Sequence, residues 1–152
     1  MNVIDHPFDV VVIGAGQAGL ACGWHLKQQG LDFLILDEQQ QPGGNWRNYY
    51  DSLELFSPAA YSSLPGLPFP GEPGHYPSRD EVVRYLEQYA SFFQLPIIPG
   101  IQVIKVDQER AIPAMQPASD KPEGWRIDVQ QVTFGADVSP NSFQRVVGGQ
   151  IL

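Results

Sequence analysis

Cysteine is almost absent from this sequence of 152 residues, in which Cys22 is the single one. One thiol excludes an internal disulfide and favours a reducing compartment. Long apolar runs are also missing, since none approaches the roughly 20 residues that a membrane-spanning helix needs. Residues 1–12 lack a basic stretch followed by a long apolar one, so they do not resemble a secretory signal. These absences predict a cytoplasmic protein without membrane contact.

Basic residues are scarce. The chain has 9 Lys and Arg against 17 Asp and Glu, which gives a formal net charge of −8. Binding of a phosphate backbone needs a basic face, so we expect no nucleic-acid partner. The three histidines, His6, His25 and His75, do not have the spacing of metal ligands, and we assign no metal site. A hydrophobic fraction of 43% is enough for a core, and the length fits a single domain over residues 1–152.

The N-terminal part has the pattern of a strand, a helix and a second strand. Residues 8–13 form an apolar run broken only by Asp9, which is typical of a strand buried on both faces. Residues 17–29 have helical spacing, and Gly30 is suited to end that helix. A second apolar strand covers residues 33–36. This βαβ unit predicts an α/β, Rossmann-like fold with a parallel sheet and a right-handed crossover.

A glycine motif joins the first strand to the helix. The G-x-G-x-x-G pattern is made by Gly14, Ala15, Gly16, Gln17, Ala18 and Gly19. Between a strand and a helix it is the dinucleotide-binding fingerprint. The first glycine permits a tight turn, the second lets the backbone approach a pyrophosphate, and the third allows close packing of the helix. We predict that these residues bind a cofactor. A glycine-rich turn that binds nothing is the alternative, and the surrounding strand–turn–helix–strand pattern disfavours it.

Two acidic residues, Asp37 and Glu38, follow the second strand. A carboxylate about 20 residues beyond the fingerprint can accept hydrogen bonds from the ribose hydroxyls of the adenosine half. Its negative charge disfavours a 2′-phosphate, so we do not expect NADP at this site. Fingerprints of this type serve both NAD and FAD.

Residues 39–77 contain many turn formers and show no clear periodicity. A Pro/Gly-rich loop of this length in a compact domain is more often functional than idle. Ser78 then predicts a helix start, because Glu81 three residues later completes a capping box. An apolar stripe follows, made by Val82, Leu86, Tyr89 and Phe93.

Beyond that stripe, Pro96 is expected to end the helix. Alternation of apolar and polar residues predicts strands over residues 101–106 and 125–129, and residues 132–138 could pair with the second of them.

The segment Gly43-Gly44-Asn45-Trp46-Arg47 adds a second pattern. Together with the fingerprint, the acidic residue after the second strand and the run over residues 53–70, it resembles the N-terminal part of the flavin-containing monooxygenases. The likeness is greatest to CzcO-type bacterial FAD-dependent oxidoreductases and extends over residues 8–106. It implies that the G-G-x-W segment, within the loop 39–77, folds over FAD.

By position, the resemblance also implies that Asn45 and Trp46 line the FAD and that the backbone of Val103 meets the adenine. Ser57 matches a position near the flavin in related enzymes, but Phe56 stands where many members have asparagine, which weakens that transfer. From the residues alone, Trp46 could be an ordinary aromatic anchor on the core.

Flavin monooxygenases have a second G-x-G-x-x-G unit that binds NADPH, and this sequence contains no second NADPH-binding domain of that kind. The run Val146-Val147-Gly148-Gly149 is at best a degraded form of the strand ending in Ala-Thr-Gly that the family has near this point. We therefore expect a chain that is C-terminally truncated relative to the family. It is either a fragment or a protein whose sheet is completed by a partner chain or an oligomer.

Two classes of function follow from these patterns. The first is the FAD-binding part of a flavin-dependent oxidoreductase or monooxygenase that uses NADPH and O₂ on a small organic substrate. The second is a non-catalytic FAD- or ADP-binding remnant or subunit that needs a partner chain. A plain NAD dehydrogenase is disfavoured by the G-G-x-W segment. No catalytic residue can be identified from the sequence.

Overall fold

The structure is a computed structural model that describes residues 7–108, 125–131 and 144–151. Its elements, in chain order, are β1 (Pro7–Ile13), α1 (Gln17–Gln28), β2 (Phe33–Leu36), the 3₁₀ helices η2 (Gly44–Asn48) and η3 (Ala59–Tyr61), α2 (Arg79–Phe92), β3 (Ile97–Ile98), β4 (Ile101–Gln108), β5 (Trp125–Gln131) and β6 (Gln144–Ile151). The predicted βαβ unit is therefore present, and β1 and β2 are parallel.

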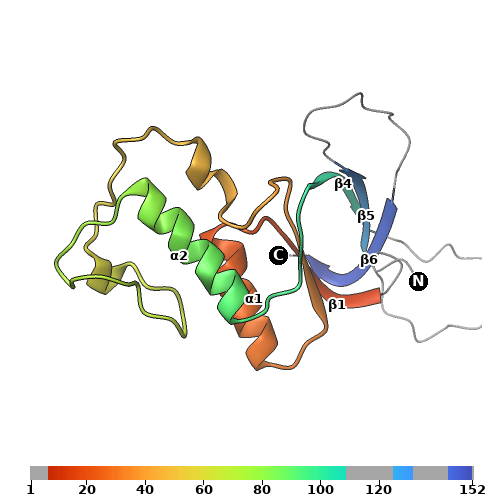
Figure 1. The fold of residues 1–152 in the computed structure, drawn as a ribbon. Helices are drawn as coiled ribbons and strands as arrows, with labels where there is room; N and C mark the ends of the chain where they lie inside the picture. Colours follow the sequence, from red (N-terminus) through yellow and green to blue (C-terminus); the bar gives the residue numbers. More distant parts are fainter. Residues whose placement is uncertain (1–6, 109–124, 132–143, 152) are drawn as a thin grey trace, which may run out of the picture.

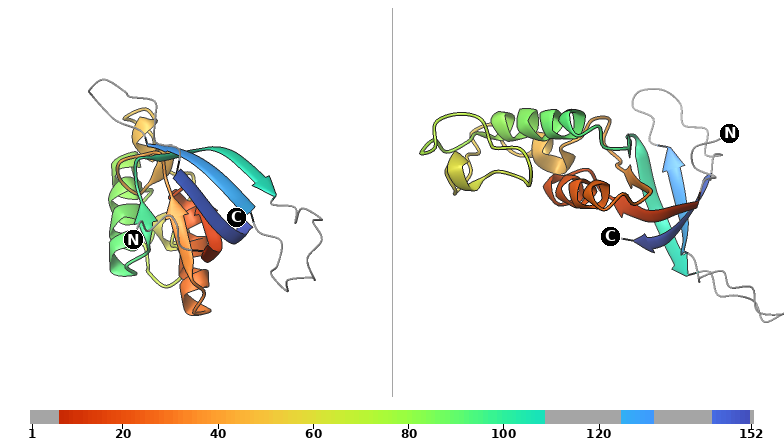
Figure 2. Two further views of the ribbon diagram at one scale, coloured as in Figure 1. Left: turned by 90° about the vertical axis from the view of Figure 1, so that its right-hand side faces the viewer. Right: turned by 90° about the horizontal axis from the view of Figure 1, so that it is seen from below.

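All strands belong to one six-stranded sheet with the order β3-β2-β1-β6-β5-β4. The strands β3, β2, β1 and β6 run parallel, whereas β4, β5 and β6 form an antiparallel meander. β6 belongs to both parts, because residues 144–148 pair with β5 and residues 147–151 pair with β1, so that Val147 and Gly148 have partners on both sides. Figure 1 and Figure 2 show α1 and α2 next to each other on one side and the meander at the other side of the parallel strands.

The core has two layers, one on each face of the parallel strands. On one face, residues of β1 and β2 such as Val10 and Ile35 pack against α1 and α2. On the other face, Val11 and Leu34 pack against the meander, with Ile127 fully buried. All four residues of β2 are buried. This double cover explains why β1 and β2 are nearly continuous apolar runs.

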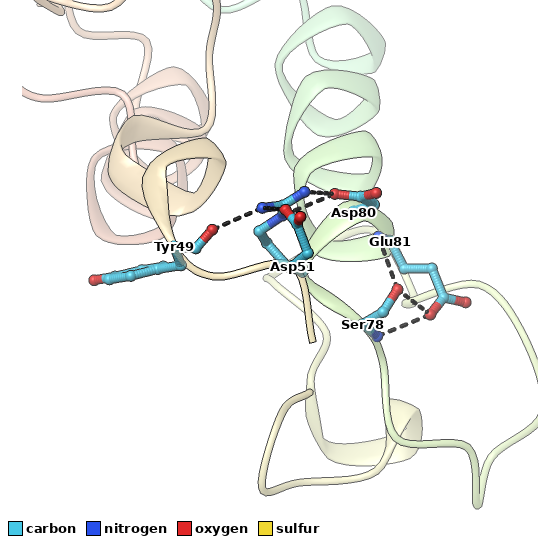
Figure 3. Close-up of polar contacts among 6 residues, drawn as sticks. Tyr49, Asp51, Ser78, Asp80 and Glu81 are labelled. Atoms are coloured by element: carbon cyan, nitrogen blue, oxygen red, sulfur yellow. Dashed lines mark hydrogen bonds and ion pairs between the residues drawn. The ribbon is translucent and has the colours of Figure 1, made fainter. Parts of the chain in front are cut away.

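The capping box predicted for α2 is confirmed. The Ser78 hydroxyl accepts a hydrogen bond from the Glu81 backbone N–H, and the Glu81 carboxylate accepts one from the Ser78 backbone N–H at 2.8 Å (Figure 3). The helix ends at Phe92 rather than at Pro96. Gln94, with φ 49°, takes the left-handed conformation that stops it, so the expected end was too late.

The capping box leads to a prediction for the pH dependence of the stability of the fold. Hydrogen bonds from Ser78 and from His75 hold the pKa of Glu81 at about 2, below its ordinary value of 4.5. Because the pKa is lower in the folded state, the stabilisation is complete above pH 4.5 and is lost as the pH falls toward 2. Glu81→Gln should therefore lose about 1 kcal/mol of unfolding free energy near neutral pH, a figure typical of a partly exposed cap.

Urea unfolding over this pH range measures the effect. As the pH falls to 2 and below, the stabilities of the Glu81→Gln variant and the wild type should converge, because the wild-type carboxyl then becomes protonated in the folded as well as the unfolded state. Glu72→Gln, in the exposed loop before the helix, is the matched control and should change nothing. A Glu81→Gln effect that does not depend on pH would show that the charge of this carboxylate is irrelevant.

Three further differences from the sequence-based expectations concern β3, residues 39–77 and β6. β3 has only two residues and was not predicted. The loop 39–77 contains the two 3₁₀ helices, so it is not wholly irregular. Residues 144–151 form β6 and pair with β1, although their sequence was interpreted as a degraded strand. Ladder hydrogen bonds come from the backbone, which does not need the Ala-Thr-Gly side chains. The pairing suggested for 132–138 lies outside the described residues.

Candidate dinucleotide-binding site

The turn between β1 and α1 has the geometry that the fingerprint requires. Gly14 has φ +100°, in the region that favours glycine, and its N–H donates to the Leu36 carbonyl at 2.7 Å. Gly16 is the N-cap of α1. No side chain caps the start of α1, and the first turn of this helix, which lies wholly within the described residues, contains no acidic residue. Its leading N–H groups are thus available to an anion.

The second and third glycines of the fingerprint have different surroundings. A Cβ on Gly16 would meet no heavy atom within 4 Å, so the space beside it is open. A Cβ on Gly19 would lie 1.8 Å from the Gly14 carbonyl oxygen. Gly19 is therefore needed for packing of helix on strand, whereas Gly16 leaves room for a ligand, in agreement with the roles predicted for them.

Asp37 is the single buried charged residue in the described part of the chain, with 5% of its surface exposed. Its Oδ2 accepts a hydrogen bond from the Ala15 N–H, and its Oδ1 accepts one from the Gln39 N–H at 2.7 Å. An ionised carboxylate offers about four acceptor positions, so it can still accept from a ribose. Its neighbour Glu38 is exposed and lies near the Gln102 amide, whose Nε2 donates to Oε2 at 3.4 Å.

The second glycine pair packs directly on the fingerprint. The Gly43 N–H donates to the Ala15 carbonyl at 2.9 Å, and Gly43 and Gly44 both have positive φ. A Cβ on Gly44 would lie 3.1 Å from the Gly16 Cα, so a larger residue would press on the fingerprint. The two glycine motifs, which are separate in the sequence, are thus in contact in the fold.

Trp46 lies between the core and a cavity. It packs against the core around α1 and α2, and it also lines a cavity over the start of α1. Its ring makes an edge contact with the ring of Tyr49, with centroids 5.5 Å apart. Arg47 is ion-paired with Glu87 of α2 and donates to the Pro42 carbonyl at 2.8 Å.

Two cavities meet at the fingerprint. The strand-end cavity, of about 350 Å³, is lined by Ile13, Gly14, Gly16, Leu36, Asp37, Glu38, Gln39, Gly44, Asn45, Ile101, Gln102 and Val103. The helix-start cavity, of about 310 Å³, is lined by Ile13, Gly14, Gly16, Gln17, Ala18, Gly19, Gly43, Asn45, Trp46 and Tyr49. They share Ile13, Gly14, Gly16 and Asn45 and so adjoin on either side of Gly16.

All the predicted site residues line these cavities except Ala15, which is buried and supports Asp37 and Gly43 through its backbone. Ser57 lines neither; its hydroxyl lies 3.0 Å from that of Ser62, and Phe56 is fully exposed. Tyr49 was missed. Its place three residues after Trp46, on one face of a helical turn, could have indicated it.

The profile of the pyridine nucleotide-disulphide oxidoreductase family matches residues 11–116, which include the fingerprint and both cavities. The chain belongs to this family. The oxidoreductase CzcO-like of Geobacillus kaustophilus is 49% identical over 109 residues, which are 72% of this chain and 31% of that protein. The probable indole-3-pyruvate monooxygenase YUCCA7 of Arabidopsis thaliana is 41% identical over 86 residues, 56% of this chain and 20% of that protein.

Among solved structures, the flavin-containing monooxygenase from Stenotrophomonas maltophilia is 36% identical with a TM-score of 0.74, covering 95% of this chain and 37% of that one. The resemblance to CzcO-type and flavin-containing monooxygenases found in the sequence is therefore confirmed. The chain spans about a third of the length of these two bacterial proteins.

Other chemical features are few in the described residues. No group of three or more His, Cys, Asp or Glu there could hold a metal ion. None of the helices in those ranges is both long enough and apolar enough to cross a bilayer. Cys22 is a free, half-buried thiol, and burial raises its pKa, which disfavours the reactive thiolate.

Proposed function

We propose that this domain binds FAD as part of a flavin-dependent oxidoreductase. The observation that carries the proposal is the open space at Gly16, with a cavity on each side and the G-G-x-W segment across it. A dinucleotide has two halves joined by a pyrophosphate, and the two cavities are joined at the N-terminus of α1. That terminus offers N–H groups and the positive end of the helix dipole to the pyrophosphate.

The adenosine half fits the strand-end cavity. Asp37 lies at its wall with acceptor capacity for the ribose hydroxyls, and the first residues of β4, including Val103, lie where the adenine would be. A 2′-phosphate would meet both Asp37 and the exposed Glu38, so FAD is favoured over NADP here.

The flavin half fits the helix-start cavity, where Trp46 and Tyr49 supply aromatic surface. In the whole protein we propose that the bound FAD supplies redox chemistry, with NADPH as reductant and O₂ as oxidant on a small organic substrate. The residues of this chain would bind and orient the cofactor. The relatives with monooxygenase names support this assignment.

The purified chain should bind FAD in preference to NADH. An absorbance spectrum of the protein after incubation with FAD and removal of free ligand tests this, and heat denaturation should release the flavin. Tight NADH binding with no affinity for FAD would refute the flavin assignment.

The second candidate is a non-catalytic FAD- or ADP-binding subunit, and residues 1–152 contain one nucleotide fingerprint, whereas the reaction uses two nucleotides. Consumption of NADPH by the FAD-loaded chain separates the two. Turnover of NADPH no faster than with free FAD supports a domain that only binds the cofactor, and faster turnover supports catalysis by residues 1–152 themselves.

A further inference from the structure

The 3₁₀ helix η2, which carries Trp46, is attached to α2 at two places. Arg47 within η2 forms its ion pair with Glu87. Just beyond η2, the Tyr49 carbonyl accepts a hydrogen bond from the Arg79 guanidinium at 2.7 Å. Glu87 and Arg79 are eight residues apart on one helix, a span of about 12 Å at the usual rise. α2 therefore supports the segment along its length without lining either cavity.

Arg79 is well placed to act as such a support. Its side chain is only 16% exposed, and its Nε donates to Asp80 at 2.9 Å. It also pairs with Asp51, and the hydrogen bonds that the guanidinium donates to the carboxylates of Asp80 and Asp51 raise its pKa, so that it stays charged. Its own backbone N–H donates to the Leu53 carbonyl at 2.8 Å. The turn after η2 is thus fixed to the first residue of α2.

The bond to the Tyr49 carbonyl is the part of this network that reaches the site. Asp51 is 94% exposed, and ion pairs with so exposed a partner contribute little to stability. Figure 3 shows the Tyr49 carbonyl facing the guanidinium while the Tyr49 ring points away from α2. That ring meets Trp46 edge-on and, with it, walls the helix-start cavity.

We propose that Arg79 is a positioning residue that holds the Trp46–Tyr49 wall of the cofactor cavity from outside and so selects for the flavin half of the dinucleotide. This inference rests on the proposed function. It predicts that loss of Arg79 weakens binding of FAD but not of ADP, because ADP needs the fingerprint and the strand-end cavity only.

Calorimetric titration of the full chain with FAD and with ADP tests the inference. For Arg79→Gln we expect the Kd for FAD to rise about tenfold and the Kd for ADP to stay within about twofold. Quenching of the bound flavin's fluorescence by the aromatic wall should also decrease. Arg79→Lys keeps the charge and can still donate to one carbonyl. This variant should therefore recover part of the FAD affinity and part of the fluorescence quenching. Arg84→Gln, the same change at an exposed position of α2, is the matched control and should alter neither.

A double-mutant cycle with Tyr49→Leu tests the route of the effect. If Arg79 acts through the Tyr49 ring, Arg79→Gln should add almost nothing in the Tyr49→Leu background, whereas independent effects would add. Equal weakening of FAD and ADP binding, or unchanged FAD binding with unchanged fluorescence, would overturn the inference while leaving the proposed function intact. A wild-type chain that binds ADP but not FAD would refute both. If Arg79→Gln fails to fold, Tyr49→Leu alone takes its place, and unchanged FAD binding and flavin fluorescence in that variant would overturn the inference.

Discussion

Replacing Gly16 by valine should abolish dinucleotide binding and leave the fold intact. The Cβ of any side chain here enters the open space between the two cavities, where the pyrophosphate must approach the backbone. Because that Cβ meets no protein atom within 4 Å, the free chain accommodates it. We expect the Kd for FAD to rise by at least about 100-fold in calorimetry, with little change in the thermal unfolding midpoint.

Gly74→Val is the matched control for this variant, since a Cβ on Gly74 also meets nothing within 4 Å and this glycine lines neither cavity. It should bind FAD like the wild type. Undiminished FAD binding by Gly16→Val would mean that residues 14–19 form only a turn. A large loss of stability in Gly16→Val would mean that the space beside Gly16 is not open.

Replacing Gly19 by alanine should have the opposite result, a large loss of stability in the ligand-free chain. The new Cβ would lie 1.8 Å from the Gly14 carbonyl oxygen, which is backbone and is held between β1 and α1. The helix would have to move away from the sheet. Overpacking of this kind costs about 3 kcal/mol, and we expect that loss in urea unfolding.

Gly23→Ala, one turn further along α1, is the comparison for this variant. A Cβ there would lie 2.8 Å from Ile35 Cδ1, the end of a side chain that can change its rotamer. Alanine also favours a helix over glycine by about 1 kcal/mol, which offsets part of the contact. We expect Gly23→Ala to be much less harmful. Equal effects at the two positions would show that backbone contact is not what requires Gly19.

The parts of the fold that could be predicted from the sequence are those specified over short distances. The apolar runs of β1 and β2, the glycines between them and the capping box at Ser78 each determine a local conformation. The cavity residues of the fingerprint and the acidic pair Asp37 and Glu38 followed from the same patterns because a dinucleotide binds where a strand turns into a helix, whereas Asn45, Trp46 and Val103 came from the resemblance to the family.

The features that were missed depend on contacts between distant parts of the chain. β3 is a strand only because Ile97 and Ile98 pair with β2, and two residues carry no periodicity. Residues 144–151 pair with β1, and backbone pairing of this kind places few requirements on the types of side chain. The contacts of Arg79 with Tyr49, thirty residues away, were equally invisible to sequence patterns.

The pairing of β1 with β6 has a consequence for how the chain acquires its structure during synthesis. β1 is synthesised before the other strands of the sheet, yet one of its neighbours, β6, is the last strand described. The layer of β1, α1, β2 and α2 is complete within the first 92 residues and can condense early. One edge of β1 must then remain open until β6 emerges. At bacterial and eukaryotic elongation rates that wait is on the order of seconds, during which the exposed strand edge is vulnerable to mispairing.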